Sequence, residues 1–370
     1  MKYNKLKKTI FFILCALCLC TAIDAEAKEK TKKIGNYKYT YTDYNSSSLW
    51  IVGITPTSNK GIKTLKIPAY IDGKKVVKLG NQYDNEEHYS ASNVFGMLRS
   101  EEDWSLQPRK TAKRVKKIGK IILPETVNEI TPHAFSEVQD GKTIHIPSGL
   151  IKNVVRLRGT KWKKFTVSSK NKKYKAKNNL LMSKNGKTVY GYVGSGKKVV
   201  IPEGVKTIGK TAFSSNDITD ITIPKSVSKI KNQAFSYIES LTIHISAKNK
   251  YYGLASNCIY SKRSGRLVAA IAQGGIITIP ETVTCLKNGT SFIGGTVKKI
   301  IFPKSLKSIR NYWNISLRYD GTMQSVFLGK NPPVFEEDAA FPSGKVYVPK
   351  GTKAKYQKIV GSESNPIYEM

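Results

Sequence analysis

A short element of the form Ile/Val-x-Ile-Pro recurs along this 370-residue chain and constrains its fold more than any other feature. The prolines that close the element are Pro68, Pro124, Pro147, Pro202, Pro224, Pro280, Pro303 and Pro349. Three neighbouring pairs are 22 or 23 residues apart, and the 46 residues from Pro303 to Pro349 equal two units of 23. A unit of this size buries too little apolar surface to fold alone, so successive units must stack around one continuous core. The sequence therefore predicts a solenoid.

Side chains alternate along each element, which predicts how its strand faces the core. The residues one and three positions before Pro are expected to point inward, and those two and four positions before it outward. Pro ends the strand at a place where no ladder N–H is needed. A second apolar pattern follows, as in Val205-x-x-Ile208 and then Ala212-Phe213. We expect each Ala-Phe pair to fill the space between one coil and the next.

A longer repeat of 78 residues is superimposed on the 22–23 residue repeat and predicts a duplicated block over 124–202 and 202–280. Ser168–Pro202 aligns without a gap to Ser246–Pro280, and both stretches are 35 residues long.

The pattern Ile-x-Ile-Pro-x-x-Val-x-x-Ile-Gly-x-x-Ala-Phe resembles the BspA-type leucine-rich repeat of bacterial secreted and surface proteins, over about residues 60–350. The resemblance implies a β-rich solenoid, a right-handed curved leucine-rich-repeat superhelix of roughly ten 22–23 residue coils with short capping elements. It also implies adhesion or binding of host proteins, and no catalysis. The chain departs from the family in having few Leu and Cys at repeat positions and in an interruption over 81–116.

The first residues predict a secretory signal peptide. Four lysines precede an apolar stretch, Ile10–Ile23, that is too short to cross a bilayer. We expect residues 1–27 to be removed by cleavage after Ala27, and the mature chain to be secreted, extracellular or at the cell surface, with retention in the periplasm left open. No small residue precedes the cysteines of this stretch, which disfavours a lipid anchor, and no later segment is apolar enough to span a membrane.

The remaining organisation follows from the repeat. Residues 28–60 carry alternating tyrosines and are expected to form an N-terminal cap hairpin. The solenoid is expected over 61–350, with a C-terminal tail over 351–370. The insertion 81–116 carries an acidic island in a basic chain and is interpreted as a protruding loop. It lacks the Asp-x-Asp-x-Asp-Gly spacing of a calcium loop.

The chain is strongly basic, with a formal net charge of +36, and its folded body keeps most of that excess. Stacked strands should place the outward residues in two rows with a strand spacing of about 4.8 Å. The first row holds the residues four positions before Pro or its Ser equivalent: Lys120, Thr143, Lys164, Lys198, Asp220, Thr242, Ile276, Lys299 and Lys345. The second row holds those two positions before it: Ile122, His145, Thr166, Val200, Thr222, His244, Thr278, Ile301 and Tyr347.

The two rows supply the predicted binding residues. The charged binding residues are Lys120, Lys164, Lys198, Lys299 and Lys345. The other predicted binding residues are Ile122, His145, Val200, His244, Ile301 and Tyr347. Lysines beside apolar side chains suit an anionic partner with some apolar surface. The alternative is that this is an ordinary solvated sheet face, whose lysines keep the protein soluble and prevent association with other sheets.

No catalytic, metal or cofactor site emerges from the residue pattern. His145 and His244 hold the same repeat position but lie several coils apart, so joint metal ligation is not expected. Cys258 falls at the position of Leu180 in the duplicated block, so we expect Cys258 and Cys285 to be free thiols rather than a disulfide, which remains the alternative.

These features predict a non-enzymatic protein that uses its sheet face to bind a protein or an anionic glycan on a host or neighbouring cell surface. The second hypothesis is a non-specific electrostatic or nucleic-acid binder. The predicted export of the protein and the lack of a known nucleic-acid-recognition module disfavour it. A polysaccharide-active enzyme is the third. It would need paired carboxylates, and Asp220 is the only acid in either row.

Overall fold

A computed structural model describes residues 29–57, 64–80, 98–99, 106–107, 119–131, 134–135, 141–151, 154, 162–194, 196–213, 218–287, 289–310, 323–336, 344–360 and 366–370. The predicted signal peptide lies outside these ranges. So does most of the insertion 81–116, of which two short strands, β7 (Leu98–Arg99) and β8 (Leu106–Gln107), form an antiparallel pair.

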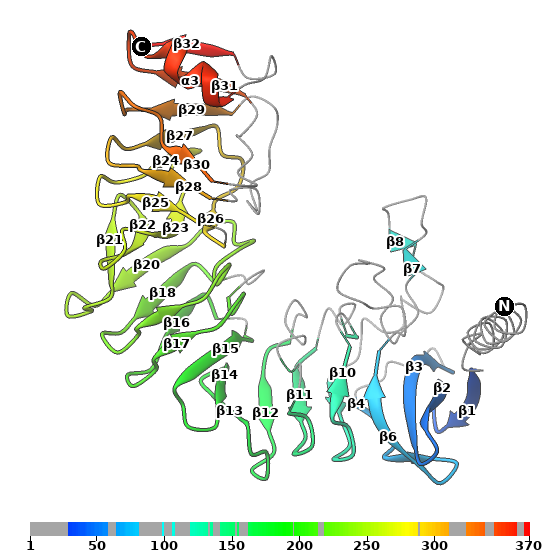
Figure 1. Ribbon diagram of the computed structural model, residues 1–370. Coiled ribbons are helices and arrows are strands. Elements are labelled where there is room, and N and C mark those ends of the chain that lie inside the picture. Colours follow the sequence, from blue (N-terminus) through cyan, green and yellow to red (C-terminus); the bar gives the residue numbers. More distant parts are fainter. Residues whose placement is uncertain are drawn as a thin grey trace, which may run out of the picture.

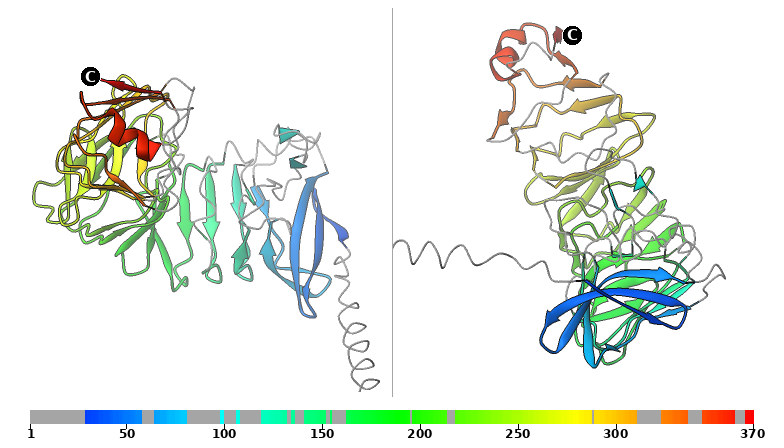
Figure 2. Two further views of the ribbon diagram at one scale, coloured as in Figure 1. Left: turned by 45° about the horizontal axis from the view of Figure 1, so that its top comes forward. Right: turned by 90° about the vertical axis from the view of Figure 1, so that its right-hand side faces the viewer.

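The chain forms a β-solenoid of about nine turns, close to the roughly ten coils predicted. Figures 1 and 2 show its strands following one another in chain order along a curved column, with the first and last strands at opposite ends. None of the described helices is long and apolar enough to cross a membrane.

The Ile-x-Ile-Pro elements form three parallel sheets along one side of the column. The N-terminal sheet contains β4 (Thr64–Lys66), β9 (Lys120–Ile122), β11 (Thr143–Ile146) and β12 (Phe165–Val167). The middle sheet contains β16 (Lys198–Val200), β18 (Asp220–Ile223) and β20 (Thr242–Ile245). The C-terminal sheet contains β24 (Ile276–Thr278), β27 (Lys299–Phe302), β29 (Gln324–Phe327), β31 (Lys345–Val348) and β32 (Ile367–Glu369).

The second apolar pattern of each coil forms short strands that pair in parallel with their counterparts in neighbouring coils. These strands are β6 (Lys74–Leu79) with β10 (Glu129–Ile130); β15 (Thr188–Tyr192) with β17 (Thr207–Ile208) and β19 (Lys229–Ile230); β23 (Leu267–Ile271) with β26 (Ser291–Ile293); and β25 (Cys285–Leu286) with β28 (Ser308–Ile309) and β30 (Val334–Phe335).

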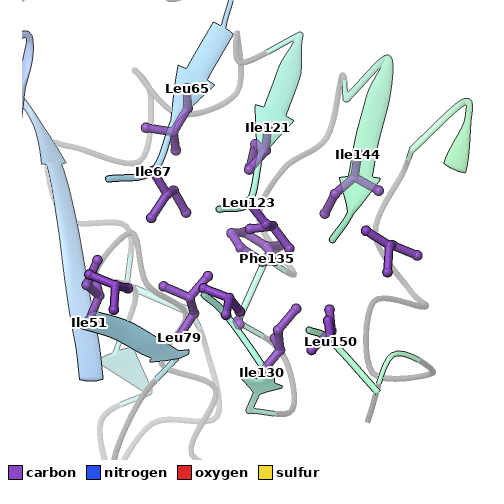
Figure 3. Close-up of a cluster of buried hydrophobic side chains, with 14 of the residues drawn as sticks. Ile51, Leu65, Ile67, Leu79, Ile121, Leu123, Ile130, Phe135, Ile144 and Leu150 are labelled. Atoms are coloured by element: carbon purple, nitrogen blue, oxygen red, sulfur yellow. The ribbon is translucent and has the colours of Figure 1, made fainter. Parts of the chain in front are cut away.

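The core lies between the two series of strands. Figure 3 shows Leu65, Ile121 and Ile144 of the N-terminal sheet directed toward Leu79 and Ile130 of the second series, and all five are fully buried. Burying an aliphatic side chain of this size stabilises the fold by about 1.5–3 kcal/mol. Because each coil adds a few such residues, stability accumulates along the column.

The Ala-Phe pairs fill the space between coils, as predicted. Ala212, Phe213, Ala234 and Phe235 are buried, and the rings of Phe213 and Phe235 stack with centroids 5.8 Å apart and an interplanar angle of 10°. The small residue leaves room for the neighbouring ring, so the pair keeps successive coils in register.

Three antiparallel strands begin the described chain: β1 (Lys30–Ile34), β2 (Tyr37–Asn45) and β3 (Ser48–Pro56). β3 then pairs in parallel with β6, which also pairs with β5 (Tyr70–Ile71). The alternating Tyr37, Tyr39 and Tyr41 side chains are buried over the first coil and so cover the end of its core.

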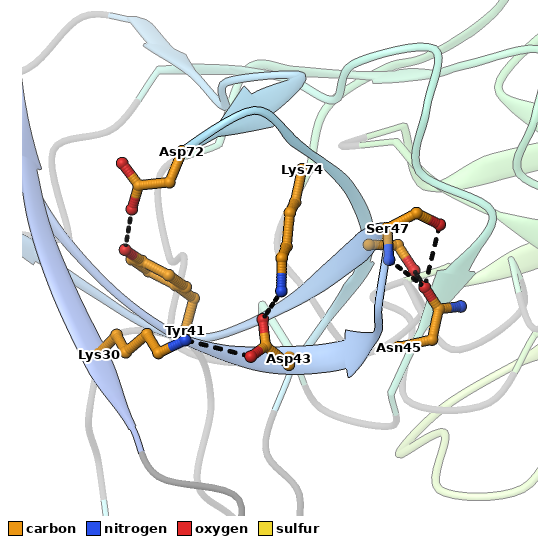
Figure 4. Close-up of polar contacts among 8 residues, drawn as sticks. Lys30, Tyr41, Asp43, Asn45, Ser47, Asp72 and Lys74 are labelled. Carbon is orange, nitrogen blue, oxygen red and sulfur yellow. Dashed lines mark hydrogen bonds and ion pairs between the residues drawn. The ribbon is translucent and has the colours of Figure 1, made fainter.

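Charged side chains join these strands to the first coil (Figure 4). Asp43 accepts hydrogen bonds from Lys74 at 2.7 Å and from Lys30 at 3.1 Å. Asp72 contacts both Lys32 and the Tyr41 hydroxyl. The edge strand β1 is itself lysine-rich and exposed, which disfavours pairing with another chain.

Two antiparallel hairpins are inserted into the solenoid 78 residues apart. β13 (Tyr174–Lys177) and β14 (Leu180–Ser183) form the first, and β21 (Tyr252–Ala255) and β22 (Cys258–Ser261) form the second. Both two-residue turns have positive φ angles throughout, 50° and 59° in the first and 47° and 56° in the second. Such angles are those of the hairpin turns that match strand twist and favour Asn.

A helix, α3 (Lys353–Val360), replaces the second strand in the last coil. Its Tyr356 is fully buried, with its ring 5.3 Å from that of Phe327. β32 follows the helix and pairs in parallel with β31. This arrangement covers the C-terminal end of the core.

Candidate functional site

The outward side of the three sheets carries the residues that the sequence singles out for binding. At each Pro-terminated element within the described residues, the side chains one and three positions before Pro are buried. The side chains at two and four positions before Pro are partly or fully exposed. The predicted alternation is therefore confirmed, and the two rows face solvent.

The rows are not continuous along the column, which corrects the simple picture of two unbroken ladders. β12 and β16 do not pair, and neither do β20 and β24. In each case an inserted hairpin lies between the two strands in the chain. The rows are therefore divided among the N-terminal, middle and C-terminal sheets, and each sheet has to be considered as a separate surface.

The five predicted lysines are spread over these surfaces rather than gathered. In the N-terminal sheet β11 lies between the strand of Lys120 and the strand that follows Lys164. In the C-terminal sheet Gln324 of β29 lies between Lys299 and Lys345. No two of the five are on hydrogen-bonded neighbouring strands, so each contributes its charge over a separate part of the face.

An acidic side chain accompanies the lysine of the middle sheet. Lys198 is in register with Asp220 of β18, and the Asp220 carboxylate lies 3.2 Å from Nε2 of His244. Val200 of the same strand is 65% exposed, but its register partner is Thr222. The middle sheet thus offers one isolated apolar side chain beside charges of both signs.

The C-terminal sheet brings together apolar side chains on adjacent strands. Ile301, Val326, Tyr347 and Tyr368 are in register across β27, β29, β31 and β32. The rings of Tyr347 and Tyr368 stack with centroids 5.4 Å apart and an interplanar angle of 26°. We call these four residues the apolar row. Tyr368 remains 43% exposed.

Cations flank the apolar row on one side. Lys299 of β27 and Lys345 of β31 occupy the first row, with the uncharged Gln324 of β29 between them. A partly exposed apolar strip with tyrosines and flanking lysines has the composition of a binding surface, because aromatic residues supply contact area at low entropic cost. The other two sheets contribute Ile122 and Val200 singly to their second rows, with His145, Thr166, Thr222 and His244 in the remaining predicted positions.

Sequence reasoning identified Lys299, Lys345, Ile301 and Tyr347 but missed Gln324, Val326 and Tyr368. In the coil that contains β29, the residue after the strand is Leu328 rather than Pro, so the motif does not mark this coil. The 46-residue interval between Pro303 and Pro349 was the available signal, since it requires one unmarked coil. Tyr368 lies in the segment expected to be a tail.

The histidines do not form a metal site among the described residues. His145 belongs to β11 of the N-terminal sheet and hydrogen-bonds Thr166 at 2.9 Å, whereas His244 belongs to the middle sheet. No group of three or more His, Cys, Asp or Glu side chains in the described ranges is arranged to hold an ion. His88, His133 and the acidic island fall outside those ranges.

Both described cysteines are free thiols. Cys258 in β22 is fully buried, its Sγ lies 3.5 Å from the carbonyl oxygen of Thr278, and burial raises its pKa to about 12. Burial also raises the pKa of the half-buried Cys285. Cys258 therefore behaves as the small apolar core residue that its alignment with Leu180 predicts.

Comparison with known proteins identifies the repeat. Residues 110–242 and 186–266 match the family described as "BspA type Leucine rich repeat region", in six copies. No curated protein matches the chain.

Several solved structures are similar to it. The pneumococcal vaccine antigen PcpA is 15% identical, with 92% of this chain and 98% of that chain covered and a TM-score of 0.35. A leucine-rich cell surface protein of Faecalibacterium prausnitzii is 16% identical, with 93% and 96% covered and a TM-score of 0.36. A leucine-rich-repeat protein of Bacteroides ovatus is 16% identical, with 92% and 99% covered and a TM-score of 0.33.

Proposed function

Because this chain carries BspA-type leucine-rich repeats, we propose that it is a secreted or cell-surface binding protein whose C-terminal sheet attaches it to a host or neighbouring cell. The partner is a matrix-type protein or an anionic glycan. The observation that carries the proposal is the apolar row, Ile301, Val326, Tyr347 and Tyr368, flanked by Lys299 and Lys345.

Two kinds of contact would contribute. The lysines attract an anionic partner and raise the rate of encounter, an effect that salt screens. The apolar row loses its water on contact, and that contribution persists at high salt. The stacked Tyr347 and Tyr368 rings form the broadest anchor and hold their orientation before binding, which lowers the entropic cost of association.

The basic charge of the chain supports a second candidate function, non-specific electrostatic binding, which includes nucleic acid. The spread of the row lysines over three sheets agrees with a general cationic surface. Such binding would follow counterion release, and every partner would be lost together as salt rises.

The test is binding of residues 28–370 to an array of matrix proteins, mucins, sulfated glycans and DNA at about 0.05 M and 0.5 M salt. The proposal predicts that one partner class is retained at high salt. It also predicts slower association when Lys299 and Lys345 are changed to Glu. Lys120→Glu combined with Lys198→Glu is the matched control, because these two lysines hold the same row position in the N-terminal and middle sheets. Loss of every partner at high salt would support the electrostatic alternative.

A further inference from the structure

A hollow of about 650 Å³ lies where the chain turns after β27, β29 and β31, near the C-terminal end of the column. Its lining includes three exposed lysines, Lys304, Lys307 and Lys330, and the apolar side chains of Leu306 and Leu328. No Asp or Glu is among the lining residues. We call this feature the turn hollow. It shares no residue with the apolar row.

Residues 329–332, which form one wall of the turn hollow, are fixed by hydrogen bonds from α3. The Tyr356 hydroxyl of α3 donates a 2.8 Å hydrogen bond to the carbonyl of Gly329, and Lys355 Nζ donates a 3.0 Å bond to Oδ1 of Asn331. Pro332 and Pro333 restrict the backbone that follows. The hollow is therefore a preformed feature, which lowers the cost of binding a ligand there.

Other turns of this solenoid use a carboxylate from the preceding coil to bind their backbone. Glu125 accepts a 2.7 Å bond from the amide of Ser148. Glu281 accepts bonds of 3.1 Å and 3.0 Å from the amides of Lys304 and Ser305. In both cases the Glu directly follows the Pro of its coil. The column thus contains its own examples of an anion bound against a turn.

The turn hollow lacks this internal carboxylate. Lys304 directly follows Pro303, in the place that Glu281 holds after Pro280. Within the described part of the chain, the amides of Gly329 and Lys330 have no hydrogen-bond partner. A cation has replaced the anion, and two more lysines surround the site. The three lysines outnumber the Glu281 carboxylate that binds the amide of Lys304, so the local charge favours an anion supplied from outside.

We propose that the turn hollow binds an acidic sugar unit, through its sulfate or carboxylate group. A single inorganic anion would leave most of the hollow empty, whereas about 300–1,000 Å³ is typical of small-ligand sites. Leu328, which is 36% exposed, can contact the C–H face of a sugar ring while the lysines bind its anionic group, and Leu306 is buried beneath it. The site is bounded by turns rather than by an open strand edge, which disfavours an extended peptide.

The proposal is tested with a sulfated disaccharide that contains a uronic acid, its desulfated form, inorganic sulfate and a short acidic peptide. Calorimetric titration of residues 28–370 at about 0.15 M salt gives the four affinities. We expect saturable binding of the disaccharides. Changing Lys307 and Lys330 together to Gln should weaken it by about tenfold or more, since each loses a charge-assisted contact.

The matched control changes two exposed lysines elsewhere on the column, Lys206 and Lys229, to Gln. It removes the same charge and should alter affinity by less than about twofold. Equal losses in the two variants, no disaccharide binding, or tighter binding of inorganic sulfate or the acidic peptide would overturn the proposal. The relative affinities of the sulfated and desulfated sugars show which anionic group is bound. A variant with Glu at Lys299 and Lys345 should keep the disaccharide, so this result is separate from that of the sheet face.

Discussion

Asn171 and Asn249, 78 residues apart in the chain, attach the two inserted hairpins to the solenoid by the same set of hydrogen bonds. The Asn171 amide donates to the carbonyls of Pro147 and Leu150 at 2.8 Å and 3.1 Å. Its Oδ1 accepts from the amides of Lys173 and Tyr174 at 2.9 Å and 2.8 Å. Asn249 repeats all four contacts one block later, and both side chains are buried. The duplicated sequence has therefore preserved a specific structural joint.

Removing this joint should destabilise the coil that carries it. Asn171→Ala leaves two carbonyls and two amides without partners in a buried place, and we expect a loss of about 2–4 kcal/mol of unfolding free energy. Urea denaturation of residues 28–370 measures it. Asn128→Ala, at an exposed position, is the control and should change stability by less than about 0.5 kcal/mol. Equal effects of the two substitutions would show that the contacts contribute nothing.

The stacked phenylalanines give a second stability test. Phe235→Ala opens a cavity between two coils and should cost about 3–5 kcal/mol. Tyr237→Ala, two residues further along and 63% exposed, removes a ring of similar size from the surface and should cost far less. If both variants unfold at the same denaturant concentration, the Ala-Phe pair does not join the coils.

Acid should loosen the first strands before the rest of the column. Hydrogen bonds from Lys74 and Lys30 lower the pKa of Asp43, and those from Lys32 and Tyr41 lower the pKa of Asp72, below the ordinary 3.8. A carboxyl group whose folded pKa is lowered contributes stability that is fully present above the unfolded pKa. That contribution is lost as the pH falls through the folded value.

Hydrogen exchange in β1 and β2 should therefore accelerate below about pH 4, relative to β16 and β18. Replacing Asp43 and Asp72 with Asn removes the titrating groups and should abolish this selective pH dependence. An identical pH response in the variant and the native chain would contradict the assignment.

The two cysteines of residues 28–370, both free thiols, should react at very different rates. Cys258 is fully buried with a pKa near 12, so it should be protected from a thiol reagent at neutral pH until the chain unfolds. Cys285 is half-buried and should react slowly in the native state. The Cys285→Ser variant of residues 28–370 should show no reactive thiol before denaturation. Rapid labelling of that variant would mean that the second hairpin opens easily.

Much of the solenoid was predictable because its local signals agree. In Ile221-Thr222-Ile223-Pro224, strand alternation, β-branched residues and the terminal Pro all indicate one orientation. The coil with β29 was hidden because two of these signals fail together. Leu328 replaces Pro, and Ser325, which is 2% exposed, occupies a core position normally held by Ile. Tertiary packing determined this strand where its own pattern did not.

The division of the outward rows could not be predicted from repeat spacing. Spacing shows that Thr166 and Val200 occupy equivalent positions, but it does not show whether their strands pair. The length of chain between β12 and β16 forms a hairpin with its own partners, and the two strands remain unpaired. A second break, between β20 and β24, makes the C-terminal sheet that carries the apolar row a separate surface.

The affinity of a double variant, Tyr347→Ala with Tyr368→Ala, for the partner retained at high salt tests the central claim most directly. The account predicts a loss of about tenfold or more at 0.5 M salt, because the stacked rings are the broadest apolar contact of the row. Val200→Ala, the exposed apolar side chain of the middle sheet, should leave that affinity unchanged. Undiminished binding by the tyrosine variant, or an equal loss in Val200→Ala, would show that the C-terminal sheet is not the binding face.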